Sequence, residues 1–352
     1  MAPRAPLSAL IIAGGSGTRL WPASRRHQPK PLFSADGKLS LLEATLARLG
    51  RLVPRERIFV LVAATHADAF RRALGGLIPA RNLIVEPAAR GTAVAIAYGM
   101  AAIARRVGAG VVAVMPADHL IEPAAGFRAT LAVAARLAAS ERAIVVIGIA
   151  PTRPETGFGY QKIGPAIGAG FKVEQFIEKP PLARARRMLA AGNFLWNAGM
   201  FVMDSETLAA ELAAHSPALG AAANSLVAMP RAKFERAYKK LAFDSFDREV
   251  VERSRNVLGV RARYRWHDVG SWDGLRRAVA GEQASVTRGN VLALDSERIV
   301  AHSDSRLMVI FGVSDLIAID AGDAILIAHR NQSDAMRRVT DELARRGMGK
   351  YL

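Results

Sequence analysis

The chain has 352 residues and a mass of 37.7 kDa, and 51% of its residues are hydrophobic while 22% are charged, which fits a folded protein of about two domains and excludes a disordered one. It has no cysteine, so disulfides, thiolate metal sites and cysteine nucleophiles are excluded, and any metal must be held by carboxylates or histidine. The formal net charge of +17 admits nucleic-acid binding, but the arginines are scattered along helix-like segments without a basic tail, so we expect small anionic partners and no nucleic acid.

Neither membrane insertion nor export is expected. The longest uncharged stretch, residues 91–104, stops at Arg105-Arg106, short of the ~20 apolar residues that span a bilayer. The apolar start of the chain continues into a glycine-rich loop and offers no credible cleavage site for a signal peptide. We therefore expect a cytoplasmic protein with no membrane contact.

The first predicted strand, residues 7–13, is short, apolar and partly β-branched, which is typical of a strand buried in a parallel sheet. It ends at the segment Gly14-Gly15-Ser16-Gly17-Thr18-Arg19-Leu20, which Pro29-Lys30-Pro31 follows closely. A turn without side chains lets backbone N–H groups approach a phosphate, and Arg19 and Lys30 would add positive charge. The segment matches neither a Walker A loop nor the dinucleotide fingerprint, whose third glycine is replaced by Leu20. A phosphate-binding loop and an ordinary tight turn both remain open at this point.

Strand-like and helix-like segments alternate over the first 150 residues. Further strands are predicted at 58–63, 82–86, 111–115 and 143–149, and helices at 41–49, 66–74, 92–106 and 127–139. This alternation predicts an α/β protein with a doubly wound, mostly parallel, Rossmann-like sheet, whose ligands bind outside the carboxyl ends of the strands. Because the segments 14–31, 86–92 and 116–122 all follow strands, we expect them to face one cleft.

The pattern changes twice after residue 150. Residues 151–280 mix turns, short helices and strand-like segments at 171–177 and 196–203, and we assign them to the same domain as residues 1–150. Short apolar strands then follow at 291–294, 299–301, 307–311, 316–319 and 324–328, before a final predicted helix at 332–346. Such close spacing predicts a small β-solenoid or barrel, so the two domains are 1–280 and 281–352.

Two aspartates are candidates for holding a metal. Asp118 follows the fourth predicted strand and could bind Mg²⁺, which prefers one or two carboxylates together with substrate phosphates. Asp268 is the best candidate for a second carboxylate. Taken separately, each is more often a helix cap or a turn residue. His119 suggests a transition metal, but it lacks a spaced ligand partner, so a local hydrogen bond is the favoured interpretation.

Three segments rich in polar groups, at 155–160, 176–180 and 196–200, suit a sugar. Glu178 and Asn197 can hydrogen-bond sugar hydroxyls, Gly159 can offer a backbone contact, and Lys179 can direct charge toward a sugar phosphate. The alternatives are a surface ion pair between Glu178 and Lys179 and core packing of Trp196.

A series of short motifs occurs in a fixed order along nearly the whole chain. They are Ala13-Gly14-Gly15-Ser16-Gly17-Thr18-Arg19-Leu20-Trp21-Pro22, Pro29-Lys30-Pro31, Glu86-Pro87, Pro116-Ala117-Asp118-His119, Pro151-Thr152-Arg153-Pro154-Glu155-Thr156-Gly157, Glu178-Lys179-Pro180, Trp196-Asn197 and Asp268-Val269-Gly270-Ser271-Trp272. This combination resembles the mannose-1-phosphate guanylyltransferase family of sugar-phosphate nucleotidyltransferases. The short strands near the C-terminus resemble the left-handed β-helical domain of that family.

The resemblance implies transfer of GMP from GTP to α-D-mannose 1-phosphate, giving GDP-mannose and pyrophosphate. It implies that Arg19 contacts the leaving pyrophosphate, that Lys30 contacts the α-phosphate, and that Asp118 and Asp268 hold Mg²⁺. The implied nucleotide-binding residues are Ala13, Gly14, Gly15, Ser16, Gly17, Thr18, Glu86, Pro87, Gly91, Thr92 and Asp118. The implied sugar-phosphate-binding residues are Gly159, Glu178, Lys179, Asn197 and Asp247. A homodimer is left open.

The sequence departs from the family pattern at two places. Gly91 and Val94 stand where the family commonly has asparagine and proline, and residues 245–250 match a sugar-side motif only loosely. The first departure concerns contacts to the base and the second concerns contacts to the sugar. Two alternatives remain: a nucleotidyltransferase for another sugar 1-phosphate, such as a heptose phosphate, and a non-catalytic relative that binds the sugar nucleotide.

Overall fold

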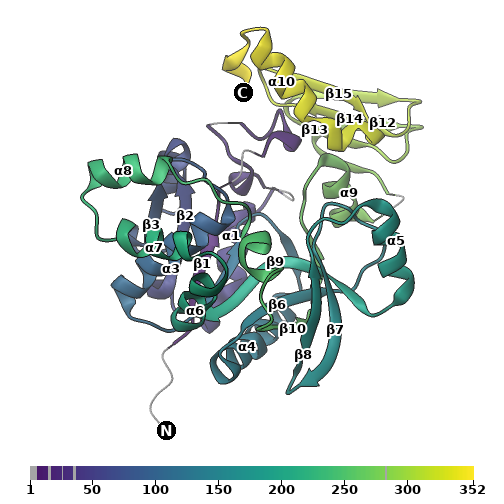
Figure 1. The fold of residues 1–352 in the computed structure, drawn as a ribbon. Helices are drawn as coiled ribbons and strands as arrows, with labels where there is room; N and C mark the ends of the chain where they lie inside the picture. Colours follow the sequence, from purple (N-terminus) through teal and green to yellow (C-terminus); the bar gives the residue numbers. More distant parts are fainter. Residues whose placement is uncertain (1–5, 15–16, 26, 35–36, 282–283) are drawn as a thin grey trace.

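A computed structural model describes residues 6–14, 17–25, 27–34, 37–281 and 284–352 of the chain (Figure 1). The glycine-rich segment is thus only partly covered, because Gly15 and Ser16 lie outside the described residues. No helix among the described residues has the length and apolar character needed to cross a membrane.

One mixed sheet forms the centre of the larger domain, with the strand order β3-β2-β1-β4-β9-β6-β10-β8-β7. Its strands are β1 (Ser8–Ile12), β2 (Ile58–Ala63), β3 (Leu83–Glu86), β4 (Val111–Pro116), β6 (Ile144–Ile149), β7 (Tyr160–Ile167), β8 (Gly170–Ile177), β9 (Phe194–Asp204) and β10 (Val257–Arg261). The predicted α/β sheet is confirmed, and strands β1 to β4 pair in parallel. However, β9 lies antiparallel between β4 and β6, and β8 is antiparallel to both of its neighbours.

Helices cover both faces of this sheet, which confirms the doubly wound arrangement. On one face lie α1 (Leu41–Leu49), α2 (Ala67–Ala73), α4 (Ala124–Glu141) and α5 (Leu182–Ala191); on the other lie α3 (Thr92–Val107), α6 (Ser205–His215), α7 (Pro217–Leu226) and α8 (Arg231–Lys239). Adjacent residues of β1 point to opposite faces, since Ala9 and Ile11 belong to one apolar core and Leu10 to the other. Burial on both faces explains why these strands are continuously apolar in the sequence.

The smaller domain, which follows α9 (Trp272–Ala280), is a parallel β-coil. It contains β12 (Val286–Leu294), β13 (Val300–Phe311), β14 (Leu316–Asp320) and β15 (Ile325–His329). Val286 pairs with Val300, and Val300 pairs with Ile317, so the chain makes successive turns of a coil before β15 returns antiparallel. Such direct parallel pairing of neighbouring strands suits the predicted solenoid.

Two predictions for this region were wrong in detail. The strands expected at 299–301 and 307–311 are parts of one long strand, β13, which turns a corner of the coil. The helix expected at 332–346 is instead a 3-10 segment, η8 (Arg330–Ala335), followed by α10 (Arg337–Arg345). Ser333 is buried there and accepts a hydrogen bond from the backbone N–H of Asp273 at 2.9 Å, a tertiary contact that the sequence pattern does not reveal.

Candidate active site

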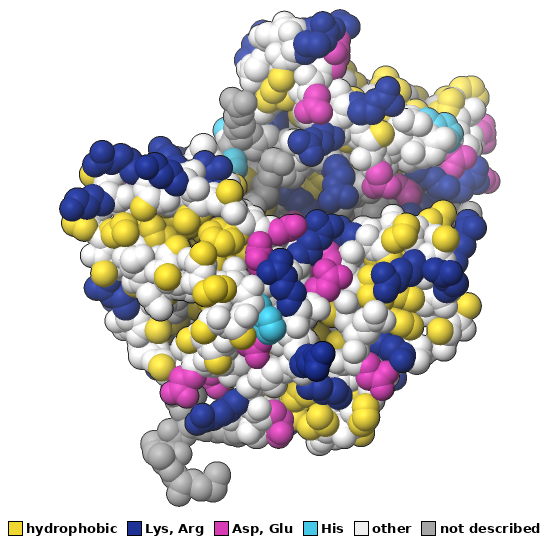
Figure 2. Space-filling model, viewed as in Figure 1, with side chains coloured by type: hydrophobic (Ala, Val, Ile, Leu, Met, Phe, Trp, Pro, Cys, Tyr) yellow, Lys and Arg dark blue, Asp and Glu magenta, His cyan; other side chains and the backbone are white. Residues whose placement is uncertain are grey.

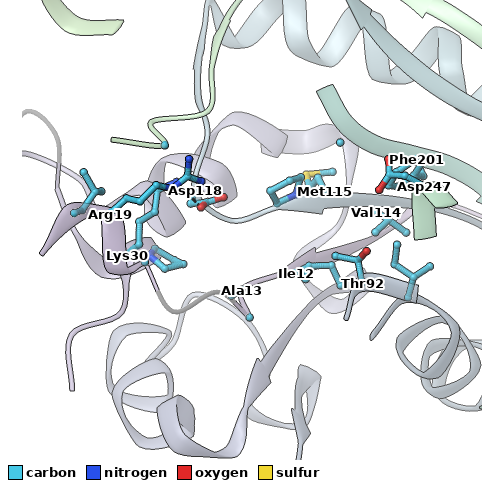
Figure 3. A pocket seen from close by; sticks show the side chains of 18 of the residues that line it. Ile12, Ala13, Arg19, Lys30, Thr92, Val114, Met115, Asp118, Phe201 and Asp247 are labelled. Carbon is cyan, nitrogen blue, oxygen red and sulfur yellow. Dashed lines mark ion pairs between the residues drawn. The ribbon is translucent and has the colours of Figure 1, made fainter. Parts of the chain in front are cut away.

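A cavity of about 430 Å³ lies at the carboxyl ends of β1 and β4, and Figure 3 shows its lining. Residues from all three predicted loops contribute to it, including Lys30, Thr92 and Asp118. The expectation that these loops face one cleft is therefore confirmed. Arg19, Lys30 and Asp118 gather at one end of the cavity, and Asp247 lies at the other end (Figure 3).

Lys30 is held between two acidic segments. Its Nζ lies 2.6 Å from Oδ2 of Asp118 and donates to the carbonyl oxygen of Asp268 at 2.8 Å. Asp268 also lies close to Arg19, because a Cβ on Gly270 would be 2.8 Å from Oδ2 of Asp268 and 3.4 Å from Nη1 of Arg19. The structure thus brings together the two cations and the two acids that the sequence analysis selected.

The short strand pair β5 (Leu120–Glu122) and β11 (Arg265–His267) explains this meeting of distant residues. His267 pairs with Leu120 in antiparallel register, so Asp268, just after β11, comes next to the segment just before β5. Neither strand was predicted from the sequence, since each is only three residues long. The metal candidates could therefore be chosen from the sequence, but not placed side by side.

The electrostatic surroundings keep Asp118 charged and His119 neutral. Burial disfavours the charged form of Asp118, but nearby charges and hydrogen bonds, led by the Lys30 ammonium, together outweigh this effect, and the pKa of Asp118 lies below its ordinary value. Burial lowers the pKa of His119 to about 4. The His119 Nδ1 accepts a hydrogen bond from the indole N–H of Trp266 at 3.0 Å. This contact confirms the local hydrogen bond that was favoured over a transition-metal site.

Glycine is required at the start of the cation-bearing segment. Gly17 has φ +58°, and a Cβ there would lie 2.2 Å from Oγ of Ser24 and 2.8 Å from Cβ of Lys30. Any side chain would therefore push against the residue that carries the ammonium group. Of the other loop residues, Ala13, Gly14 and Thr18 also line the cavity.

A buried carboxylate stands beneath the glycine-rich loop. Glu86, at the end of β3, is 2% exposed and accepts a hydrogen bond from the Tyr238 hydroxyl at 2.6 Å through Oε2. Its other oxygen, Oε1, would lie 3.1 Å from a Cβ on Gly14. Burial raises the pKa of Glu86, and the hydrogen bond from Tyr238 opposes that rise. The sequence analysis missed Tyr238, which comes from α8, far away in the chain.

Gly91 and Thr92 contact the segment that precedes Asp247. Thr92 Oγ1 accepts from the backbone N–H of Phe246 at 3.0 Å. Gly91 has φ +86°, and a Cβ there would lie 3.2 Å from the carbonyl oxygen of Phe243. The positive φ and this close approach give a physical reason for glycine at this position. Among the described lining residues, Thr92 is present, whereas Glu86, Pro87 and Gly91 are not.

The predicted sugar-side residues gather around two carboxylates. Asn197 donates through Nδ2 to Oδ1 of Asp247 at 2.9 Å, and its backbone N–H donates to the carbonyl oxygen of Gly159 at 2.7 Å. A Cβ on Gly159 would lie 2.8 Å from Oε2 of Glu178, so glycine leaves room for that carboxylate. Burial, and next the charge of Glu178, raises the pKa of Asp247 to about 7. Asp247 is the member of this group that lines the cavity.

Glu178 and Lys179 do form an ion pair, with Oε1 and Nζ 3.2 Å apart. The pair is not a simple surface contact, since the Glu178 side chain is 6% exposed while that of Lys179 is 55% exposed. Lys179 adopts φ +45°, an uncommon conformation for a residue other than glycine. The backbone thus turns the lysine outward and leaves its neighbouring carboxylate buried beside Asp247.

A doubly wound sheet, a glycine-rich loop after its first strand, and cations that face an acid in the adjoining cavity define this protein as a nucleotidyltransferase. The chain belongs to the nucleotidyl transferase family, whose model matches residues 8–285. A second model, for the MannoseP isomerase/GMP-like beta-helix domain, matches residues 289–343 and confirms the β-helical nature of the smaller domain.

Curated relatives resemble the chain over nearly its full length. The xanthan biosynthesis protein XanB of Xanthomonas campestris pv. campestris is 35% identical over 96% of this chain and 73% of its own length. The mannose-1-phosphate guanylyltransferase of Escherichia coli is 34% identical over 98% of this chain and 75% of its own length. A crystal structure described as mannose-1-phosphate geranyltransferase from Thermus thermophilus has a TM-score of 0.88 and 35% identity, and covers 96% of this chain and 99% of its own. The family resemblance inferred from the motifs is thereby confirmed.

Proposed function

We propose that the protein transfers GMP from GTP to α-D-mannose 1-phosphate, with release of pyrophosphate. The observation that carries this proposal is the position of Lys30 and Arg19 beside Asp118 and Asp268, in a cavity that also contains Asp247. The cations suit a triphosphate, and the polar cluster around Asn197 suits sugar hydroxyls. Relatives named as mannose-1-phosphate guanylyltransferases support the choice of base and sugar.

The reaction brings two anions together, so neutralising charge is the main task of the side chains. An oxygen of the sugar phosphate attacks the α-phosphorus of GTP in line, and the bond to the pyrophosphate oxygen breaks. We assign Lys30 to the α-phosphate, since Asp118 and the Asp268 carbonyl already hold its ammonium in one place. Arg19 takes the charge that develops on pyrophosphate. A prepositioned charge needs no reorganisation during the reaction.

Asp118 and Asp268 would hold the divalent cation, which we propose to be Mg²⁺. The Asp118 carboxylate and the Asp268 carbonyl contact the same ammonium group, so both aspartates offer hard oxygens in one region, which suits a small divalent cation shared with substrate phosphates. The lowered pKa of Asp118 keeps its carboxylate ionised at neutral pH. When bound, the cation would neutralise charge on the reacting phosphates.

We assign the guanosine part of the nucleotide and mannose 1-phosphate to neighbouring parts of the site, since Thr92 on the nucleotide side contacts the segment that precedes Asp247 on the sugar side. Residues 13–18, with 86, 87, 91 and 92, would surround the guanosine part of the nucleotide, where Glu86 supplies a carboxylate oxygen near Gly14. The residues that would contact mannose 1-phosphate are Gly159, Glu178, Lys179, Asn197 and Asp247. The cluster of carboxylates on this side suits neutral hydroxyls, while Lys179 supplies charge for the phosphate.

A pyrophosphate-release assay tests the proposal directly. GTP, ATP, UTP and dTTP are each combined with the 1-phosphates of mannose, glucose and a heptose. We expect the highest kcat/KM with GTP and mannose 1-phosphate, and dependence on an added divalent cation. Preference for another sugar phosphate would replace the sugar assignment. No turnover with any pair would identify a non-catalytic relative that only binds sugar nucleotide.

We also propose that the catalytic domain ends at residue 280 and that the coil of the C-terminal domain, residues 281–352, carries a homodimer interface. Large apolar side chains line one exposed face of the coil, namely Leu292, Leu294, Leu307, Val309 and Phe311. Leu292 pairs with Val309 and Leu294 with Phe311, so these side chains form adjacent rows. Each copy carries a net charge of +17, so an apolar face is better suited to association of two copies than the basic surface elsewhere.

A further inference from the structure

The segment that carries Arg19 and Lys30 lies against the C-terminal domain. In Figure 1 the purple segment that follows β1 is drawn next to the yellow chain end and α10. Leu20, Trp21 and Phe33 are buried in one apolar cluster together with residues of the coil and of the chain beyond it. The coil residues of that cluster are Val300, Ile317, Ile319 and Leu326, and Met336 follows them. The two domains thus share a core at the catalytic segment.

Polar contacts fix this segment at several points. The indole N–H of Trp21 donates to the carbonyl oxygen of Tyr351 at 2.8 Å, close to the end of the chain. The Arg25 guanidinium makes a bidentate pair with Asp323, at 2.7 Å from Nη1 to Oδ2 and 2.6 Å from Nη2 to Oδ1. The Arg25 side chain is 5% exposed, so the guanidinium of this pair is shielded from solvent.

A further contact lies beyond Lys30. Arg288, on β12, donates to the carbonyl oxygen of Ser34, and its guanidinium lies over the Phe33 ring at 5.8 Å. Contacts from the C-terminal domain therefore lie close in the chain to both cations. Trp21 is two residues beyond Arg19, and Phe33 is three residues beyond Lys30.

We propose that the C-terminal domain is part of the catalytic machinery, because Asp323 and Tyr351 position the segment that presents Arg19 and Lys30 to the phosphates. This inference rests on the proposed function for the roles of those two cations. Asp323 and Tyr351 are positioning residues, since they touch the segment and not the cavity. Small displacements of charged groups reduce turnover strongly, so a bidentate pair at this distance has a kinetic effect.

The test uses the full chain in the reverse reaction, with GDP-mannose and pyrophosphate as substrates. For Asp323→Ala we expect kcat/KM for pyrophosphate to fall by roughly tenfold, and the KM for GDP-mannose to change by less than about twofold. Trp21→Phe, which removes the donor to Tyr351 but keeps an aromatic ring in the core, should act in the same direction. The double variant Arg25→Ala/Asp323→Ala should lose little more than either single variant, because both changes break the same contact.

Arg298→Ala is the matched control. Arg298 makes a bidentate pair with Asp315 at 3.0 and 2.9 Å within the same coil, and no described contact of its side chain reaches residues 17–34. Its kinetic constants should equal those of the wild type. Wild-type constants for Asp323→Ala, or an equal loss in the control, would overturn the proposal.

Hydrogen exchange separates this inference from the proposed function. Peptides that contain Leu20 or Phe33 should exchange faster in Asp323→Ala than in the wild type or in Arg298→Ala, whatever reaction the protein performs. If the wild type does not turn over GDP-mannose, the assigned reaction fails, and the exchange rates still decide whether the coil holds the segment. Unchanged exchange in Asp323→Ala would refute that positioning role.

Discussion

At the level of single residues, the site depends on ionisable groups whose pKa values are set by burial and by nearby charges. Glu86 and Asp247 are acids whose pKa values burial raises, whereas Lys30 lowers the pKa of Asp118. Burial raises the pKa of Glu86, and burial and the charge of Glu178 raise that of Asp247, while the hydrogen bonds from Tyr238 and Asn197 oppose these rises. Each acid thus has a different protonation behaviour although the side chains are chemically alike.

Lys30 offers the most direct test of charge neutralisation. We expect Lys30→Ala to lower kcat by a factor of about 10² to 10³, by analogy with the loss of one oxyanion-stabilising donor. Steady-state pyrophosphate release at saturating substrates measures the effect. Lys239→Ala, an exposed lysine on α8, should leave kcat unchanged. Wild-type turnover in Lys30→Ala would show that its assigned role is wrong.

Tyr238 is expected to act on the nucleotide through Glu86. Tyr238→Phe removes the hydroxyl that donates to Glu86 but keeps the ring, which packs against Tyr98 and Phe234. We expect the KM for GTP to rise by roughly fivefold, which corresponds to about 1 kcal/mol, with kcat and the KM for sugar phosphate unchanged.

Initial-rate measurements with each substrate varied in turn provide the test. Tyr98→Phe is the control, because it alters the same aromatic cluster and leaves the Tyr238–Glu86 hydrogen bond in place. Equal GTP constants in both variants would argue against a role for the hydrogen bond.

Asp247 should make stability depend on pH. The pKa of Asp247 is about 7 in the folded state, against about 3.9 in an unfolded chain. Between these two pH values the folded state binds one proton more than the unfolded chain. The free energy of unfolding therefore falls as the pH rises from about 3.9 to about 7. Asp247→Asn keeps an oxygen for Asn197 but cannot ionise. We expect this variant to be more stable than the wild type at pH 8 by roughly 1–3 kcal/mol.

Urea unfolding at pH 8 and at pH 4.5 measures this difference. The advantage of Asp247→Asn should be much smaller at the lower pH, where the wild-type carboxyl is protonated in the folded state. Asp341→Asn, an exposed change on α10, should show no such dependence. An equal stability difference at both pH values would contradict the assigned pKa.

Among the secondary-structure elements, α1 holds one wall of the site. Its Arg48 donates to the carbonyl oxygen of His119 at 2.8 Å, and Thr45 Oγ1 donates to that of Ala117 at 3.3 Å. Both acceptors flank Asp118 in the chain. The helix itself starts with a capping box, in which Ser40 and Glu43 exchange hydrogen bonds. Helix α1 therefore both begins with a local capping signal and supports the segment that carries Asp118.

Loss of the cap should cost stability. We expect Ser40→Ala to lower the free energy of unfolding by about 1 kcal/mol, since it leaves the Glu43 backbone N–H without its side-chain acceptor. Urea unfolding measures the loss. Ser225→Ala, at an exposed position within α7, should change the stability little. A Ser40→Ala variant as stable as the wild type would show that the cap is dispensable.

Across the protein as a whole, charge and apolar surface are distributed differently. Lys and Arg side chains are spread over the face shown in Figure 2, and Asp and Glu side chains are interspersed among them. By contrast, Leu307, Val309 and Phe311 are each more than half exposed on the coil. The large positive charge therefore favours capture of anionic substrates, and the apolar rows suit the contact with a second copy that we propose.

The dimer is tested by mass in solution. We expect light scattering to report about twice the mass of one chain, and Phe311→Asp to shift the protein toward the monomer, because a charge would be buried in the interface. Leu77→Asp, an exposed apolar position of the catalytic domain, should leave the mass unchanged. A monomeric wild type would refute the interface.

Local patterns in the chain were enough to predict the class of fold, the strands that precede the cavity and the residues that carry charge. Apolar runs marked β1, β2 and β4 because strands buried on both faces have no polar side. The motifs and their order along the chain were sufficient to identify the family, because each motif is a short local pattern of residues. Helix α1 was predicted with its observed bounds, because its cap and its apolar spacing are local signals.

Only the tertiary structure shows which of these residues lie next to one another. The β5–β11 pair brings Asp118 and Asp268 together, the antiparallel β9 places Asn197 beside Asp247, and α8 brings Tyr238 to Glu86. These contacts join residues far apart in the chain, so no local pattern encodes them. For the same reason, the sequence did not reveal the contact between the two domains, in which Asp323 pairs with Arg25. The sequence by itself determines the chemistry of each side chain. Which side chains lie close together depends on how the whole chain packs.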